Sequence, residues 1–143
     1  MMHSEILKPV VVLIAWTLAM LVWMVTTRLP AMRAAGVDMA TLVGTKGSDA
    51  DGRLPPKTQW IAHNYNHLME QPTLFYAVCG VIALTGTGDG ANAWIAWLYV
   101  ALRIAHSIWQ ATVNKVSVRF ILFLGSTLAL VALTLHAGMA VFV

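Results

Sequence analysis

Residues 9–29 read PVVVLIAWTLAMLVWMVTTRL, an apolar run that holds three threonines and no charge before Arg28. A helix of about 20 apolar residues is long enough to cross a hydrocarbon core of roughly 30 Å. The run is too long for the apolar part of a cleaved signal peptide, and it lacks a good small-residue exit site. We therefore expect residues 9–29 to form a membrane-spanning helix.

The composition of the whole chain indicates the same class of protein. Of its 143 residues, 59% are hydrophobic and only 10% are charged, and the mean hydropathy is +0.72. Soluble domains carry about 25% charged residues, so this composition is typical of an integral membrane protein. The pI of about 9.4 does not indicate nucleic-acid binding, because the basic residues are expected in loops rather than on one solvated face.

Three further stretches have the length and hydropathy of spanning helices. Together with the first they predict one all-α membrane domain over residues 1–143, in which four transmembrane helices form a bundle. The joint between the last two helices is so short that they must form an antiparallel hairpin. The expected helices cover residues 9–29, 60–86, 92–113 and 117–142, with one long loop at 30–57.

The distribution of Lys and Arg predicts the orientation, because cytoplasmic loops carry an excess of positive charge. The basic residues at the first loop are Arg28, Arg33, Lys46, Arg53 and Lys57. Lys115 and Arg119 lie at the loop after the third span, whereas the turn at 86–92 has no Lys or Arg. We therefore expect both basic loops in the cytoplasm and both termini on the opposite side of the membrane.

Polar side chains interrupt the apolar sequence mainly in the second and third spans. In the second span, one face at spacing i, i+3, i+4 and i+7 holds His63, Asn66, His67 and Glu70. In the third span, the spacing i, i+3 and i+7 aligns Arg103, His106 and Gln110. The two faces should meet, and Glu70 is the expected partner of Arg103, because an unpaired charge inside a membrane is costly.

Two alternatives to a ligand-binding site are consistent with these residues. Polar residues in membrane helices often serve only to hold helices together, and a buried Glu–Arg pair can do no more than fix their register. A metal site is the other alternative, with His63 and His67 as ligands and Glu70 or His106 completing the shell. The expected proximity of Arg103 argues against a metal, since its positive charge would oppose the ion.

The combined polar residues predict a cationic, hydrogen-bonding pocket for a small anionic or zwitterionic ligand. Its expected members are Asn66, Glu70, Arg103, His106, Gln110 and Arg119. Arginine binds carboxylates through two parallel hydrogen bonds, and a nearby guanidinium favours a thiolate, which is the nucleophilic form of a thiol. Glutathione offers two carboxylates, an ammonium group and a thiol. Its reaction partner would arrive from the lipid.

The segment LRIAHSI at 102–108 is followed by Arg119-Phe120. This pattern resembles the Ala-Arg-x-x-His-Thr-x segment and the later Arg of the MAPEG family. These are the membrane-associated proteins in eicosanoid and glutathione metabolism. The layout of four short spans with a long first loop is also similar. The resemblance implies a bacterial-type member in an inner membrane. It also implies a homotrimer that holds glutathione, as co-substrate, between its protomers. A thin four-helix bundle with polar residues near its surface agrees with such an assembly, because neighbouring protomers would cover those residues.

The resemblance implies a role for each matched position. Arg119 would be catalytic and stabilise the glutathione thiolate. The residues implied in glutathione binding are Asn66, Glu70, Arg103, His106, Gln110 and, more weakly, Arg28. No metal is implied. The expected partners are lipophilic small molecules and membrane lipids.

The sequence departs from the family pattern in its second span. The family spaces its Asn and Glu three residues apart, whereas Asn66 and Glu70 are four apart, and Tyr65 stands where an Arg normally precedes that Asn. Gln110 replaces an aromatic hydroxyl. The sequence therefore leaves two functions open: a glutathione transferase or peroxidase acting on lipophilic electrophiles or lipid hydroperoxides, and a non-catalytic scaffold or accessory subunit of the same fold.

Overall fold

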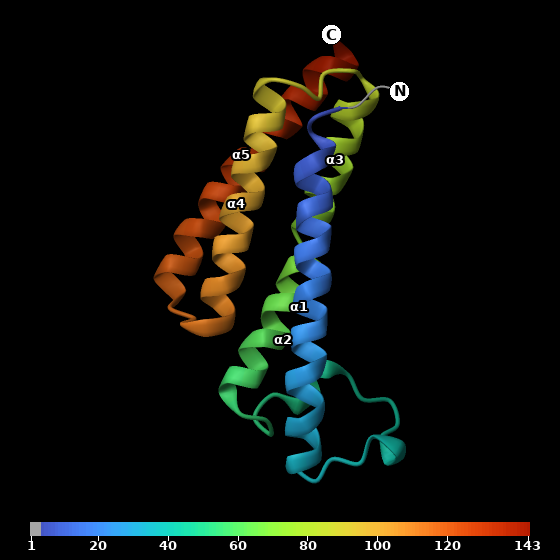
Figure 1. Ribbon diagram of the computed structural model, residues 1–143, viewed down its shortest axis with the longest axis vertical. Coiled ribbons are helices and arrows are strands. Elements are labelled where there is room, and N and C mark those ends of the chain that lie inside the picture. The colour runs from blue at the N-terminus through green and yellow to red at the C-terminus, as the bar shows by residue number, and fades with distance from the viewer. Residues whose placement is uncertain (1–3) are drawn as a thin grey trace.

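The computed structural model describes residues 4–143 as an elongated helical bundle (Figure 1). The long helices are α1 (Leu7–Ala34), α4 (Ala91–Thr112) and α5 (Val116–Phe142). Two shorter helices, α2 (Pro56–Leu68) and α3 (Pro72–Leu84), follow one another along the bundle and form its fourth column. The predicted four-column helical architecture is therefore present, with one column divided.

The division of the expected 60–86 helix is the main difference from the sequence prediction. Proline has no N–H, and inside a helix its ring clashes with the carbonyl of the residue four positions earlier. For Pro72 that residue is Leu68, where α2 ends. Pro72 then occupies the first turn of α3, a position where proline is tolerated. Residues 69–71 lie between the two helices, so Glu70 does not continue the polar face of α2.

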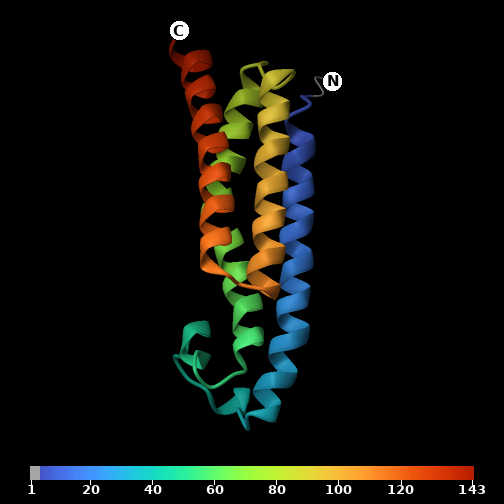
Figure 2. The same ribbon diagram turned by 90° about the vertical axis from the view of Figure 1, so that its left-hand side faces the viewer.

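The first helix is longer than predicted. It was expected to end near residue 29, but α1 continues through Pro30 to Ala34. The long loop after α1 contains two short 3-10 helices, η1 (Met39–Thr41) and η2 (Gly47–Ala50). Figure 2 shows this loop at the end of the bundle where α1 and α2 extend past the α4–α5 turn. The start of α1 and the end of α5 are both at the opposite end of the bundle.

The core runs along the middle of the four columns, where α4 packs on α5, α1 and α2 while α3 packs on α5 and α1. Phe75 and Tyr99 stack within it, with ring centroids 4.2 Å apart. Other fully buried core residues are Leu13, Cys79, Ile82, Ala96 and Leu133. Every column contributes to this core, and each therefore depends on its neighbours for burial.

The outer faces of α1 and α5 are apolar and exposed. On α1 they include Val11, Leu18 and Val22, and on α5 they include Phe120, Ile121, Leu128 and Leu135. Within residues 4–143, α1 and α5 are the helices long and apolar enough to cross a membrane by length and composition. Monomeric soluble proteins rarely expose such continuous apolar surface, so these two helices fit a membrane protein.

Candidate functional site

A cavity of about 210 Å³ lies between α2, α4 and α5, and we call it the bundle cavity. It is lined by His67, His106, Val116, Arg119, Phe120 and Phe123. Two residues of the predicted site, His106 and Arg119, therefore meet at one opening although they come from different helices. The phenylalanines supply an apolar wall beside these polar groups.

Arg119 stands in the first turn of α5 and is held by the turn that precedes this helix. Its Nη1 donates a hydrogen bond to Asn114 Oδ1 at 2.6 Å, while its Nε is buried and has no partner within residues 4–143. Asn114 has a φ of 58°, in the left-handed region that Asn tolerates better than most residues. The tight α4–α5 turn thus fixes one edge of the guanidinium and leaves the rest available to the bundle cavity.

Arg103 lies behind this cavity and is completely buried. Its Nη2 donates to His67 Nδ1 at 3.2 Å and to the His67 carbonyl oxygen at 3.1 Å. Its Nε and Nη1 have no partner among the described residues. The second contact places a cation at the C-terminal end of α2, where the helix dipole is negative.

The predicted ion pair between Glu70 and Arg103 is wrong. Across residues 4–143, no carboxylate lies within ion-pair distance of the Arg103 guanidinium. Glu70 is exposed, and its nearest charged or titratable contact is His67 Nδ1 at 3.7 Å from Glu70 Oε2. The prediction assumed one continuous helix, whereas α2 ends at Leu68 and Glu70 lies in the connection to α3.

The two histidines of the bundle cavity contact each other edge to face. The ring centroids of His67 and His106 are 4.8 Å apart with an interplanar angle of 71°, and the ring of Phe123 lies 5.7 Å from that of His67. His106 is 2% exposed, whereas His67 is partly exposed at the cavity. The cavity therefore presents imidazole and guanidinium groups beside aromatic carbon.

Other predicted site residues lie elsewhere. Gln110 shares the buried face of α4 with Arg103 and His106, but it does not line the bundle cavity, and its Oε1 has no partner within the described chain. Asn66 is exposed and also outside the cavity lining. The shared face of the polar residues on α4 is confirmed. On α2, His67 lines the bundle cavity, whereas His63 and Asn66 are exposed.

His63, one ligand of the metal alternative, is also separated from the other candidate ligands. His63 is exposed and its Nε2 lies 3.3 Å from Asp51 Oδ2 in the long loop, away from the pair formed by His67 and His106. From residue 4 to residue 143, no three His, Cys, Asp or Glu side chains are grouped as a metal site requires.

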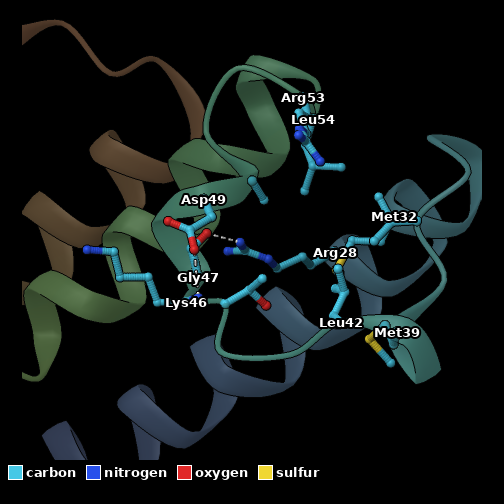
Figure 3. Close-up of a pocket in the computed structure, with 12 residues that line it drawn as sticks. Arg28, Met32, Met39, Leu42, Lys46, Gly47, Asp49, Arg53 and Leu54 are labelled. Carbon is cyan, nitrogen blue, oxygen red and sulfur yellow. Dashed lines mark hydrogen bonds between the residues drawn. The ribbon is translucent and has the colours of Figure 1, made fainter.

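Arg28, the weakest member of the predicted set, lies in a second cavity formed by the end of α1 and the long loop (Figure 3). We call it the loop cavity; its volume is about 380 Å³. Arg28 reaches across it, and its Nη2 donates to the Gly47 carbonyl oxygen. The remaining lining includes Met32, Met39, Leu42, Lys46, Asp49 and Arg53. Within one protomer, Arg28 therefore does not reach the bundle cavity.

Sequence reasoning assigned no ligand contact to His67, which lines the bundle cavity and is the only side chain to hydrogen-bond Arg103 in the described residues. It considered His67 only as a metal ligand or as part of the polar face of α2. One signal was present in the sequence. His67 precedes Glu70 by three residues, which is the spacing at which the family carries its Asn.

Comparison with known protein families gives a match that covers nearly the whole chain. The model of the MAPEG family matches residues 6–139, which include all five α-helices except the last three residues of α5. No curated protein and no solved structure matches the chain. Because the family match covers nearly the full length of the sequence, the chain belongs to the MAPEG family.

Proposed function

We propose that this protein is a membrane-bound glutathione transferase or peroxidase that acts on lipophilic electrophiles or lipid hydroperoxides. The observation that carries the proposal is the meeting of His106 and Arg119 at the bundle cavity, in front of the buried cation of Arg103. Guanidinium groups donate strong hydrogen bonds to anions and cannot accept any. The cavity has one guanidinium and no carboxylate in its lining, with a second guanidinium buried behind it, and this arrangement is suited to an anionic ligand.

In this proposal Arg119 stabilises the glutathione thiolate, which is the attacking form. In the transferase reaction the sulfur forms a bond to an electrophilic carbon, and the leaving group departs with its bonding electrons. In the peroxidase reaction the sulfur attacks the peroxide, releasing the alcohol after protonation and leaving a sulfenic acid on glutathione. A second glutathione then condenses with it to give the disulfide and water. The phenylalanine wall would receive the lipophilic partner.

The proposed setting is an inner membrane, with both termini away from the cytoplasm and a homotrimer as the assembly. The exposed apolar faces of α1 and α5 support contact with membrane lipids or neighbouring protomers. The bundle cavity, at about 210 Å³, is smaller than the roughly 300 Å³ of common ligand pockets. Glutathione would therefore extend beyond it, which supports a site completed by a second copy of the chain.

The test is a titration of detergent-purified protein with glutathione, followed by ultraviolet absorbance of the thiolate. The wild type should give a saturable signal, and Arg119→Gln should lose it while keeping the same oligomer. Lys115→Gln is the matched control, because it removes the same charge four residues earlier and does not line the bundle cavity. Absence of a wild-type signal at millimolar glutathione would refute the proposal.

A non-catalytic scaffold or accessory subunit is the second candidate. The observation that favours it is the placement of Asn66 and Glu70 on the exposed surface and of Arg28 in the loop cavity, since all three were expected to hold glutathione. In that case the buried polar residues only join helices, as Gln71 does when its Nε2 donates to Thr127 Oγ1 at 2.8 Å. A protein that forms a stable oligomer but binds no glutathione would support this candidate.

A further inference from the structure

The contact between Arg103 and His67 determines which nitrogen of His67 carries a proton. Arginine remains charged in proteins and can only donate hydrogen bonds. His67 Nδ1, at 3.2 Å from Arg103 Nη2, must therefore accept, and it can accept only when it is unprotonated. A doubly protonated His67 would place two positive charges at this distance with no hydrogen bond between them. The imidazole is therefore neutral, with its proton on Nε2.

The protonated nitrogen is the one available to a ligand. Nε2 is separated from Nδ1 by one ring carbon, and its N–H points in a different direction from the Nδ1 lone pair that faces Arg103. Within residues 4–143 it has no hydrogen-bond partner, and it is not among the buried unpartnered atoms, whereas Arg103 Nε and Nη1 are. His67 also lines the bundle cavity. An N–H donor with no partner among residues 4–143 thus belongs to a side chain that shares the lining of the bundle cavity with Arg119.

Glu70 does not compete for this proton. Its Oε2 lies 3.7 Å from Nδ1, the nitrogen that already accepts from Arg103. His106 contacts the His67 ring edge to face and makes no hydrogen bond with it within the described residues. The residues packed around His67 therefore hold its ring in place and leave its Nε2 unoccupied.

We propose that His67 is a glutathione-binding residue, which donates its Nε2–H to the thiolate sulfur that Arg119 also stabilises. This inference rests on the proposed function and adds a second donor to its site. Arg103 is then a positioning residue, since it fixes the His67 tautomer without touching the ligand. The expected loss on removing one donor to a charged group is about tenfold or more in affinity.

Two substitutions at one position separate the two nitrogens of the ring. His67→Asn places an amide oxygen near the Nδ1 position, which keeps an acceptor for Arg103, but it does not reach the Nε2 position. His67→Gln reaches the Nε2 position with an amide N–H and lacks the nearer acceptor. We expect His67→Asn to melt close to the wild type yet to bind glutathione at least tenfold more weakly by thiolate absorbance.

The other variant should show the opposite pattern. His67→Gln should bind within about threefold of the wild type and melt at a lower temperature, because Arg103 loses its side-chain partner. Wild-type affinity in His67→Asn would overturn the role of His67 while leaving the proposed function intact. Absence of a thiolate signal in the wild type would overturn both, since the named ligand would then not bind.

A ligand-free measurement tests the tautomer separately. In protein labelled with ¹⁵N at histidine, the His67 signals are identified by their absence from the His67→Asn spectrum. We expect a protonated Nε2 and an unprotonated Nδ1 at neutral pH. A protonated Nδ1 would overturn the inference whether or not glutathione binds.

Discussion

The bundle cavity contains Arg119, predicted to be catalytic, and the loop cavity contains Arg28, predicted to bind glutathione, yet the two arginines are held in different ways. Arg119 is fixed through its side-chain contact with Asn114 at a tight turn between two long helices. Arg28 bridges to the backbone of a loop by donating to the Gly47 carbonyl oxygen. Behind the first cavity lie buried polar groups that have no partner within residues 4–143, whereas the residues of η2 in the second are mostly exposed.

The difference indicates which of the two cavities gains more free energy when an anion binds. A donor that is buried and unpartnered, such as Arg119 Nε, costs free energy until a ligand or water satisfies it. An arginine that is partly exposed and already contacts a carbonyl, such as Arg28, has less to gain from a ligand. The bundle cavity is therefore the better candidate for tight anion binding, although the loop cavity is larger.

The largest expected effect is on the free energy of unfolding, which should depend much more on the packing of the core than on that of the loop cavity. Phe75 is fully buried and stacked on Tyr99, so Phe75→Ala should lower the free energy of unfolding by about 3–5 kcal/mol. Leu42, a loop-cavity residue that is 41% exposed, should change it by about 0.5 kcal/mol or less when replaced by Ala. Thermal and denaturant unfolding in detergent would measure both. Equal losses would mean that the loop is part of the core.

The next largest effect is on catalytic activity, which should fall much more when Arg119 is replaced than when Arg28 is replaced. Arg119→Gln should lower kcat/KM for glutathione conjugation by about 100-fold, the scale found when a charge-stabilising donor is removed. Arg28→Gln should change kcat/KM by about threefold or less, because its guanidinium lies in the loop cavity. Steady-state kinetics with a lipophilic electrophile would measure this. A similar loss in both variants would indicate that the two cavities form one site between protomers.

A smaller effect concerns the loop itself. Loss of the Arg28–Gly47 contact in Arg28→Gln should lower the free energy of local opening by about 1 kcal/mol. Hydrogen exchange should therefore become about fivefold faster around η2 and stay unchanged in α4. Unchanged exchange around η2 would show that the loop is held by other contacts, such as the bond from the Lys46 backbone N–H to Asp49 Oδ2 at 2.9 Å.

The smallest effect is expected at the pair formed by His63 and Asp51. Their side chains are 48% and 43% exposed, and solvent screens such a pair, which contributes about 0.2–1 kcal/mol at most. Asp51→Asn should therefore shift the melting temperature only slightly, and high salt should remove the difference. A large shift that persists in high salt would mean that this contact anchors the loop to α2.

Much of the fold was predictable from hydropathy, because long apolar segments must form helices when their backbone groups lie in lipid. The four columns and the α4–α5 hairpin follow from it. The division at Pro72 was not predicted, although the proline was visible in the sequence. Hydropathy averaged over a window is hardly changed by one proline. A helix is interrupted by it, because the proline lacks the backbone N–H and its ring clashes with the preceding turn.

The site was predicted in part. His106 and Arg119 meet at the bundle cavity, and the polar face of α4 is buried, as the spacing on this continuous helix indicated. The spacing argument failed for Glu70, because α2 ends at Leu68 and residues four apart share a face only while the helix is unbroken. It therefore gave Glu70 a partner that it does not contact, and it placed His67 on the polar face without including it in the cationic pocket.

The sequence by itself determined the class of protein, the apolar columns and the motif residues on α4 and α5, since these depend on composition and on periodicity within single helices. Only the tertiary structure decided that Arg103 meets His67 and not Glu70, and that Arg28 belongs to a separate cavity. The first outcome depends on the helix break before Pro72, and the second on the packing of the long loop against the end of α1. Contacts between helices are set by that three-dimensional register, which spacing along one helix does not contain.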